Sequence, residues 1–273
     1  MAAVVTRSTA RDADVVSGAG VRHVLAVGDS NTYGLYLDRE QAYPIVFAQR
    51  ENAIARERVS VVNAAFPGVN SSQLRNLLPE LLRSVRPTDV FVMVGANDWW
   101  TLPEPIRAGG TEPSRPLWLR SRVLRLFVIL ERWFEAPAVL EKDAAGMPVK
   151  GSGTIPVGDE RWRLSWTRLP AGNPQWEADL ESNLRAIVTD TAAAGATPWL
   201  LTYPAEDPIY GRVNQVLRRV AAETATNLVD AGAEFRARCP SSDCRDLFFP
   251  DHHPTAEGHV LVADLLTRAW AGR

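Results

Sequence analysis

The 273-residue chain has little of several features that define protein classes. It has two cysteines, Cys239 and Cys244, too few for a disulfide framework. Reduced thiols in a cytoplasm are therefore the default expectation, and a small local disulfide is the alternative. No apolar run approaches the roughly 20 residues of a spanning helix, which argues against transmembrane anchoring. The net charge of −2 gives no electrostatic reason to expect nucleic acid as a partner.

Several catalytic signatures are also missing. The sequence has no Gly-x-Ser-x-Gly elbow, no Walker phosphate loop and no dinucleotide-binding glycine fingerprint. It has no His-Glu-x-x-His motif, and its two cysteines have no second pair of metal ligands beside them. The residues thus give no support for a metal or an organic cofactor, and we expect neither.

The first 20 residues carry charged side chains and lack the apolar core of a signal peptide. We expect residues 1–20 to be a mobile leader and residues 21–273 to form one α/β domain. The expected location is cytoplasmic, with export as the alternative.

Short apolar runs alternate with segments of helical length along most of the chain, which is typical of parallel β-α-β units. The runs predict a sheet of five strands, at residues 24–27, 59–62, 90–94, 199–202 and 228–229. The longer segments predict helices at about residues 41–54, 71–84, 176–194, 208–224 and 255–270. The last helix has a clear start, because Pro254 suits a helix entrance and Thr255 suits an N-cap.

Residues 99–176 interrupt this alternation and hold seven of the nine tryptophans. We interpret them as an inserted cap or lid. Residues 117–134 have apolar side chains at three- and four-residue spacing and predict an amphipathic helix, while residues 146–158 are a candidate β-hairpin. Packing of the helix on its own domain is the first interpretation. A substrate lid, a homodimer face and a membrane-surface contact are the alternatives.

A serine stands where the first predicted strand ends, in the tripeptide GDS of residues 28–30. Ligands bind at that edge of open parallel sheets. Because a serine is a poor nucleophile without a base, Ser30 needs a histidine. His253 is the best candidate, since Pro254 keeps it extended before the last helix. Asp251 is close enough to orient its ring, and His252 is interpreted as an exposed neighbour.

Two loops after later strands offer hydrogen-bond donors for an oxyanion. Gly68 follows the second strand and can present its backbone N–H without a side chain in the way. Asn97 follows the third strand, in residues 95–98, and can offer its side-chain amide. The adjacent Asp98 is interpreted as a structural hydrogen-bonding residue.

With these four segments the sequence resembles the SGNH hydrolases, also called GDSL-type esterases and lipases. The matching segments are residues 28–30, the Gly68 loop, residues 95–98 and residues 251–254. The resemblance covers roughly residues 22–98 and 177–270. It implies a flavodoxin-like three-layer α/β/α sandwich with a mainly parallel sheet, ester hydrolysis without a metal, and a covalent acyl-serine intermediate.

The resemblance also assigns roles by position. Ser30 becomes the nucleophile, His253 the general base and Asp251 its orienting acid. The oxyanion hole is then formed by the backbone N–H groups of Ser30 and Gly68 and by the side chain of Asn97.

The acid departs from the family's pattern. The family's acid usually stands three residues before the histidine, and Pro250 occupies that position here. Asp251 stands two residues before His253, so Asp246 is the reserve acid. A loop-terminating or helix-dipole role is the alternative for Asp251.

The sequence as a whole predicts a serine esterase acting on a small or medium carboxylic ester, such as an acylated sugar or a lipid-like ester. Trp99 and Trp100 follow Asn97 closely and are expected to line the substrate pocket. Two alternatives stay open. One is an O-acyltransferase, in which an alcohol replaces water on the same acyl-serine; the other is a non-catalytic carbohydrate-binding module with tryptophans as stacking surfaces.

Overall fold

The computed structural model describes residues 11–12, 20–54, 58–101, 103, 140–142, 148–157, 160–167, 173–241 and 244–272. The chain divides into two compact units, one of residues 1–99 with 174–273 and the other of residues 100–173. The predicted helix at residues 117–134 lies outside the described residues, as does most of the predicted leader.

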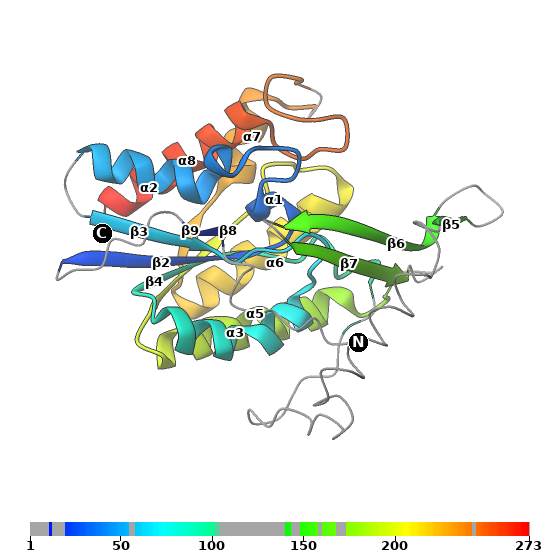
Figure 1. Cartoon of the computed structure of the whole chain (residues 1–273), viewed down its shortest axis with the longest axis horizontal. Coiled ribbons are helices and arrows are strands. Elements are labelled where there is room, and N and C mark those ends of the chain that lie inside the picture. The colour runs from blue at the N-terminus through cyan, green and yellow to red at the C-terminus, as the bar shows by residue number, and fades with distance from the viewer. Residues whose placement is uncertain are drawn as a thin grey trace. The chain divides into compact units, whose positions relative to one another are not determined.

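A sheet with five parallel strands forms the centre of the first unit (Figure 1). The five predicted strands are confirmed, and numbered in chain order they lie in the sequence 2-1-3-4-5, the flavodoxin-like order. The two-residue strand β1 (Arg11–Asp12), within the predicted leader, adds an antiparallel edge next to β3. The parallel strands are β2 (Val21–Gly28), β3 (Arg58–Asn63), β4 (Asp89–Met93), β8 (Thr197–Leu201) and β9 (Asn227–Val229).

The two central strands owe their apolar sequences to burial on both faces. All five residues of β4 are buried, and β2 is buried from Val24 to Gly28. Strands covered on both faces show continuous apolar runs instead of alternation. Gly28 has a second reason to be glycine, because an added Cβ would meet the Met93 carbonyl oxygen at 2.1 Å. The end of β2 therefore lies directly against the end of β4.

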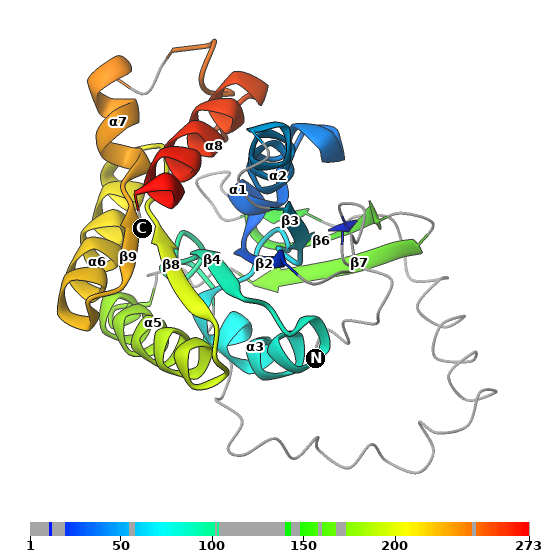
Figure 2. The ribbon, with the colours of Figure 1, turned by 90° about the vertical axis from the view of Figure 1, so that its left-hand side faces the viewer.

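Helices cover both faces of the sheet (Figures 1 and 2). α2, α7 and α8 lie on one face, and α3, α5 and α6 lie on the other. The five predicted helices are confirmed, whereas α7 was not predicted because eight residues are too few to show a helical period. The helices are α2 (Tyr43–Ile54), α3 (Ser71–Val85), α5 (Trp176–Ala193), α6 (Pro208–Thr224), α7 (Ala231–Arg238) and α8 (Ala256–Ala271).

Polar caps fix where three of these helices begin. Thr255 caps α8 by accepting from the Gly258 N–H, as predicted. Asn70 caps α3 by accepting from the Gln73 N–H, and Asp207 accepts from two N–H groups at the start of α6. A side-chain acceptor at this position typically contributes about 1 kcal/mol to helix stability. The caps fix the loops in front of these helices, and those loops carry several residues of the candidate site.

The tryptophans predicted to lie in the insertion do not form one group. Trp176 is buried in α5, and Trp99 is partly buried against the core of the first unit. Trp162 and Trp166 belong to the second unit's strand β7 (Glu160–Thr167). Trp100 is the first residue of that unit and is half-buried. Trp176 is thus a core residue of the first unit and not part of a cap.

The second unit contains a three-stranded antiparallel sheet, in the order β5-β6-β7. Its other strands are β5 (Leu140–Lys142) and β6 (Pro148–Val157). The predicted hairpin within residues 146–158 is wrong, because residues 148–157 form one strand, which pairs with β7 from Lys150 to Val157. Glycine and proline signal turns locally, but pairing with a neighbouring strand outweighs that signal.

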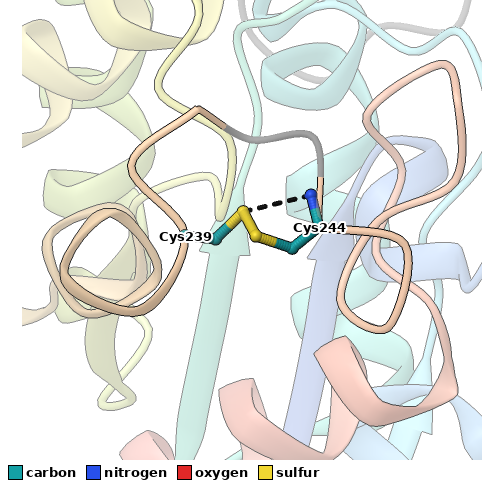
Figure 3. The surroundings of a disulfide bond; sticks show 2 residues. All are labelled: Cys239 and Cys244. Atoms are coloured by element: carbon teal, nitrogen blue, oxygen red, sulfur yellow. Dashed lines mark hydrogen bonds between the residues drawn. A yellow bond between two sulfur atoms is a disulfide. The ribbon is translucent and has the colours of Figure 1, made fainter.

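A disulfide bond joins Cys239 and Cys244 (Figure 3). The expectation of reduced thiols is therefore wrong. Cys239 caps the end of α7, and the two Cα atoms lie 6.0 Å apart, within the range that a disulfide can span. The sequence shows the five-residue separation but not this approach. The bond also removes the argument for a cytoplasmic location that rested on reduced thiols.

Among the described residues, no helix is both long and apolar enough to cross a membrane.

Candidate active site

Ser30 lies at the point where β2 gives way to the one-turn helix α1 (Ser30–Tyr33). Asp29 follows the last residue of the strand and caps this turn, since its carboxylate accepts from the Asn31 N–H at 3.0 Å. Ser30 is the first residue of the turn, so its backbone N–H has no partner one turn earlier in the helix. The local sequence thus places a hydroxyl and an open N–H together at the carboxyl edge of the sheet.

The structure brings His253 to this serine from 223 residues further along the chain. Its Nε2 lies 2.8 Å from Ser30 Oγ. The loop around it is closed by backbone hydrogen bonds, from the Phe249 N–H to the His253 carbonyl and from the Thr255 N–H to the Leu247 carbonyl. This is the contact that a serine needs in order to lose its proton to a base.

Asp251 lies on the other side of the imidazole. Its Oδ2 is 3.0 Å from His253 Nδ1, and its Oδ1 accepts from the His253 backbone N–H at 3.3 Å. Nδ1 is buried, and its contact with Oδ2 is short but not aligned as a hydrogen bond; it becomes an ion pair only when the imidazole is protonated. The reserve acid, Asp246, is exposed, and its backbone carbonyl accepts from the Thr255 hydroxyl.

Two opposing effects set the pKa of Asp251. Partial burial raises it, but the hydrogen bond from the Tyr36 hydroxyl and the charge of His253 lower it more. The net pKa lies below the ordinary value, so the carboxylate stays charged at neutral pH. Its negative charge therefore faces the imidazole whenever the ring takes up a proton.

Asn97 links the segments that carry Ser30 and Gly68, the other two predicted oxyanion donors. The Asn97 amide nitrogen donates to the Val69 carbonyl at 2.9 Å and lies 3.4 Å from Asp29 Oδ2. Asn97 is thus held between the neighbour of Ser30 and the neighbour of Gly68. In the described part of the chain, the N–H groups of Ser30 and Gly68 donate to no protein group. Gly68 has φ of 82°, a left-handed conformation that favours glycine.

Asp98, next to Asn97, has a different environment. Its carboxylate accepts from the Ser71 N–H at 2.9 Å and from the Ser71 hydroxyl, which in turn accepts from the Asn183 amide. Burial raises the pKa of Asp98 to about 7, although the Ser71 hydrogen bonds act in the opposite direction. Asp98 therefore joins the start of α3 to α5 and does not contact His253.

His252 is not the exposed neighbour that the sequence predicts. Its side chain is half-buried, and its Nδ1 lies 2.6 Å from Oδ2 of Asp207, the residue that caps α6. The two adjacent histidines thus contact different elements, His253 the start of α1 and His252 the start of α6. Sequence reasoning missed Asp207 because it is 45 residues from its partner.

Tyr203 is a second residue that sequence reasoning missed. Its hydroxyl donates to Asp29 Oδ2 at 2.6 Å and accepts from the Ala96 N–H at 3.1 Å. Tyr203 thus joins the serine segment to the loop that carries Asn97. Burial raises the pKa of Asp29, and the hydrogen bonds of Tyr203 and Asn31 offset part of that rise. The available signal was position, since Tyr203 follows β8 at the same sheet edge.

Ser30, His253 and Asp251 thus lie in series, with the imidazole between the hydroxyl and the carboxylate. Within the described residues, no three His, Cys, Asp or Glu side chains are grouped so as to hold a metal ion.

Comparison with known families decides the class of the protein. The model of the GDSL-like Lipase/Acylhydrolase family matches residues 26–261, a range that includes all four segments. The chain belongs to this family. The GDSL-like protein is accordingly a serine hydrolase that acts on ester bonds.

Solved structures share the fold of the GDSL-like protein. TesA is 20% identical, with a TM-score of 0.56, and the match covers 92% of this chain and 99% of TesA. The psychrotrophic esterase EstA from Pseudoalteromonas sp. is 18% identical over 92% of this chain and 100% of its own, with a TM-score of 0.53. Axe2, an acetylxylan esterase from Geobacillus stearothermophilus, is 18% identical over 91% and 93%, with a TM-score of 0.53. A comparison with curated proteins finds no match.

Proposed function

We propose that the protein hydrolyses a small or medium carboxylic ester through an acyl-serine intermediate. Ser30 is the nucleophile, His253 the general base and Asp251 the acid that orients the imidazole. The observation that carries the proposal is the 2.8 Å contact between Ser30 Oγ and His253 Nε2, with Asp251 behind the ring. At this distance the imidazole can take the proton of the serine hydroxyl and so activate it as a nucleophile.

The first half of the reaction transfers the acyl group to the enzyme. Ser30 Oγ attacks the ester carbonyl carbon while its proton passes to His253 Nε2, and the carbonyl oxygen becomes an oxyanion. When the tetrahedral intermediate collapses, the bond to the alcohol oxygen breaks and that oxygen takes the proton from Nε2. The alcohol leaves, and the acyl group stays on Ser30.

The second half repeats these steps with water. His253 removes a proton from a water molecule, whose oxygen attacks the acyl carbon. Collapse of this intermediate releases the carboxylic acid and returns the proton to Ser30 Oγ. In both halves the imidazole is transiently positive, and the Asp251 carboxylate at 3.0 Å from Nδ1 stabilises that charge.

The oxyanion is assigned to the N–H groups of Ser30 and Gly68 and the amide of Asn97. Donors that are fixed before the reaction stabilise developing charge without reorganising. Support comes from the two N–H groups that donate to no described protein group. Asn97 is assigned by its position, since its amide contacts the neighbours of both, Asp29 and Val69.

Substrate contacts are proposed for Trp99 and Trp100 on the basis of sequence position, because both follow Asn97 within three residues. A homodimer through residues 99–176 and a cytoplasmic location stay predictions from the sequence. Size-exclusion chromatography of the full chain tests the first, and cell fractionation tests the second.

Turnover of p-nitrophenyl acetate by Ser30→Ala tests the proposed function. We expect a loss of about 10⁴-fold or more, because the variant keeps the fold and lacks the nucleophile. Ser84→Ala removes an exposed hydroxyl from the end of α3 and should match the wild type. Ser30→Ala activity within a few-fold of the wild type would overturn the proposal.

A further inference from the structure

Four non-glycine residues in the described part of the chain have a positive φ. Two of them, Arg86 and Ala225, end α3 and α6, where a left-handed residue is common. The other two, Tyr36 with φ of 70° and His252 with φ of 65°, cap no helix. This conformation is unfavourable for a side chain with a Cβ, and such residues gather at functional sites. Tyr36 and His252 both lie beside the candidate active site.

Tyr36 contacts both the acid and the base. Its hydroxyl donates to Asp251 Oδ2 at 2.8 Å, and this is the same oxygen that lies 3.0 Å from His253 Nδ1. Its ring meets the His253 ring edge-on, with 5.8 Å between centroids, and meets Phe249 edge-on at 5.4 Å. One side chain thus fixes the carboxylate oxygen and also limits the tilt of the imidazole.

Asp251 has few other restraints. Its side chain is 44% exposed, and its other hydrogen bond within the described part of the chain is the one at 3.3 Å from the backbone of its own loop. Water competes for an exposed carboxylate, and the contact to Nδ1 is not well aligned. A hydrogen bond from a neutral donor to a charged acceptor is stronger than one between neutral groups, so the tyrosine hydroxyl can hold the carboxylate against this competition.

We propose that Tyr36 is a positioning residue, whose hydroxyl holds Asp251 Oδ2 beside His253 Nδ1. The inference rests on the proposed function, since it assigns Tyr36 to the same triad. Tyr36 lies three residues beyond α1, so the loop that follows the nucleophile also restrains the acid. The hydrogen bond to Asp251 raises the pKa of Tyr36, which keeps the hydroxyl protonated and able to donate.

The test is a double-mutant cycle of Tyr36→Phe and Asp251→Ala with p-nitrophenyl acetate. Tyr36→Phe keeps the ring and removes the hydroxyl from a residue that is 64% exposed, so we expect an unchanged melting temperature. We expect kcat to fall about tenfold with KM unchanged, because the hydroxyl acts on the base and not on the substrate. In the Asp251→Ala background the hydroxyl has lost its acceptor, and Tyr36→Phe should change the release rate of p-nitrophenol by less than about twofold.

Two results would overturn the role of Tyr36. One is a kcat for Tyr36→Phe within twofold of the wild type. The other is an equal loss with and without Asp251, which would show that the hydroxyl does not act through the acid. Ser30→Ala measured in the same assay distinguishes a failure of the Tyr36 role from a failure of the proposed function. If Ser30→Ala is inactive and Tyr36→Phe is normal, the role of Tyr36 alone fails; if Ser30→Ala stays active, the proposed function fails and the role of Tyr36 fails with it.

Discussion

The two halves of the candidate active site are held in opposite ways. The nucleophile half, defined as Asp29, Ser30, Asn97 and Tyr203, lies just beyond the ends of buried strands, and Asp29 and Tyr203 are 0% exposed. The base half, defined as Tyr36, Asp251, His252 and His253, is built on loops, with Tyr36 64% and the Asp251 side chain 44% exposed. The first half is held by burial, and the second is held by backbone hydrogen bonds within its loop and by a few side-chain contacts.

Because of this difference, substitutions in the two halves should affect stability and activity differently. Removing a buried hydrogen bond leaves a polar group without a partner away from water, which costs about 1–3 kcal/mol of stability. At an exposed position water replaces the lost partner, so the fold is little affected. Changes in the nucleophile half should therefore lower stability and activity together, while changes in the base half should lower activity alone.

The largest effect is expected from the two adjacent histidines. His253→Ala should lower kcat by about 10³-fold or more, because the serine loses its base, while the melting temperature stays close to that of the wild type. His252→Ala removes the contact to Asp207 and should lower kcat by less than about tenfold. Steady-state turnover of p-nitrophenyl acetate by the pair checks this. The reverse order would mean that His252, and not His253, is the base.

A smaller loss is expected at the oxyanion. Asn97→Ala should lower kcat by about a hundredfold, the usual effect of removing one oxyanion donor. Because Asn97 is 8% exposed and donates to the Val69 carbonyl, thermal unfolding should also shift to lower temperature. Kinetics and a thermal melt on the same sample check both expectations. An unchanged kcat with a lowered melting temperature would leave Asn97 a purely structural residue.

Tyr203→Phe removes a hydroxyl from the nucleophile half, as Tyr36→Phe does from the base half. We expect a loss of about 1–3 kcal/mol in the free energy of unfolding, because Asp29 and the Ala96 N–H both lose a buried partner. A fall of about tenfold in kcat should accompany it as Asn97 becomes less well fixed. Urea denaturation of both variants checks the contrast, and equal stability losses would contradict it.

The smallest effect on catalysis is expected at Asp98, whose substitution should instead change how the stability of the fold depends on pH. Its pKa in the folded state, about 7, lies above the ordinary value, so the folded protein binds this proton more tightly than the unfolded chain. The resulting stabilisation is present below about pH 4 and is lost as the pH rises through about 7. Asp98→Asn cannot release a proton, so the free energy of unfolding of the wild type should fall relative to this variant over that range, by up to a few kcal/mol.

Urea denaturation between pH 4 and 8 measures this difference. The same substitution at the exposed Asp246 is the control. A wild-type stability that rises relative to Asp98→Asn with increasing pH would show that the buried carboxyl is charged throughout.

The parts of the fold that the sequence predicted are those with strong local signals. Residues 90–94 form a continuous apolar run because β4 is buried on both faces, and Thr255 is an N-cap that marks the start of α8. Ser30, Asn97 and His253 were candidates for the same reason, since each stands where an element ends or begins. Their positions along the chain were enough, together with the parallel topology, to expect them at one edge of the sheet.

The rest depends on contacts between distant residues, which no local pattern encodes. Tyr36 meets Asp251 across 215 positions, and Tyr203 meets Asp29 across 174. Both tyrosines look like ordinary loop residues in the sequence, because a hydroxyl donor has no characteristic spacing. The disulfide was missed for a similar reason, since five residues of separation permit a bond but do not require one.

Labelling with a p-nitrophenyl ethylphosphonate, followed by peptide mapping, is the most direct test of whether Ser30 is a nucleophile that His253 activates. EstA, which shares the fold, has been crystallised as inhibited by monoethylphosphonate. An activated serine attacks the phosphorus and expels p-nitrophenolate, which leaves the ethylphosphonyl group on the serine oxygen. We expect one label per chain, on Ser30, formed at least about a hundredfold more slowly in His253→Ala. A label on another residue, or equal labelling rates with and without His253, would contradict this expectation.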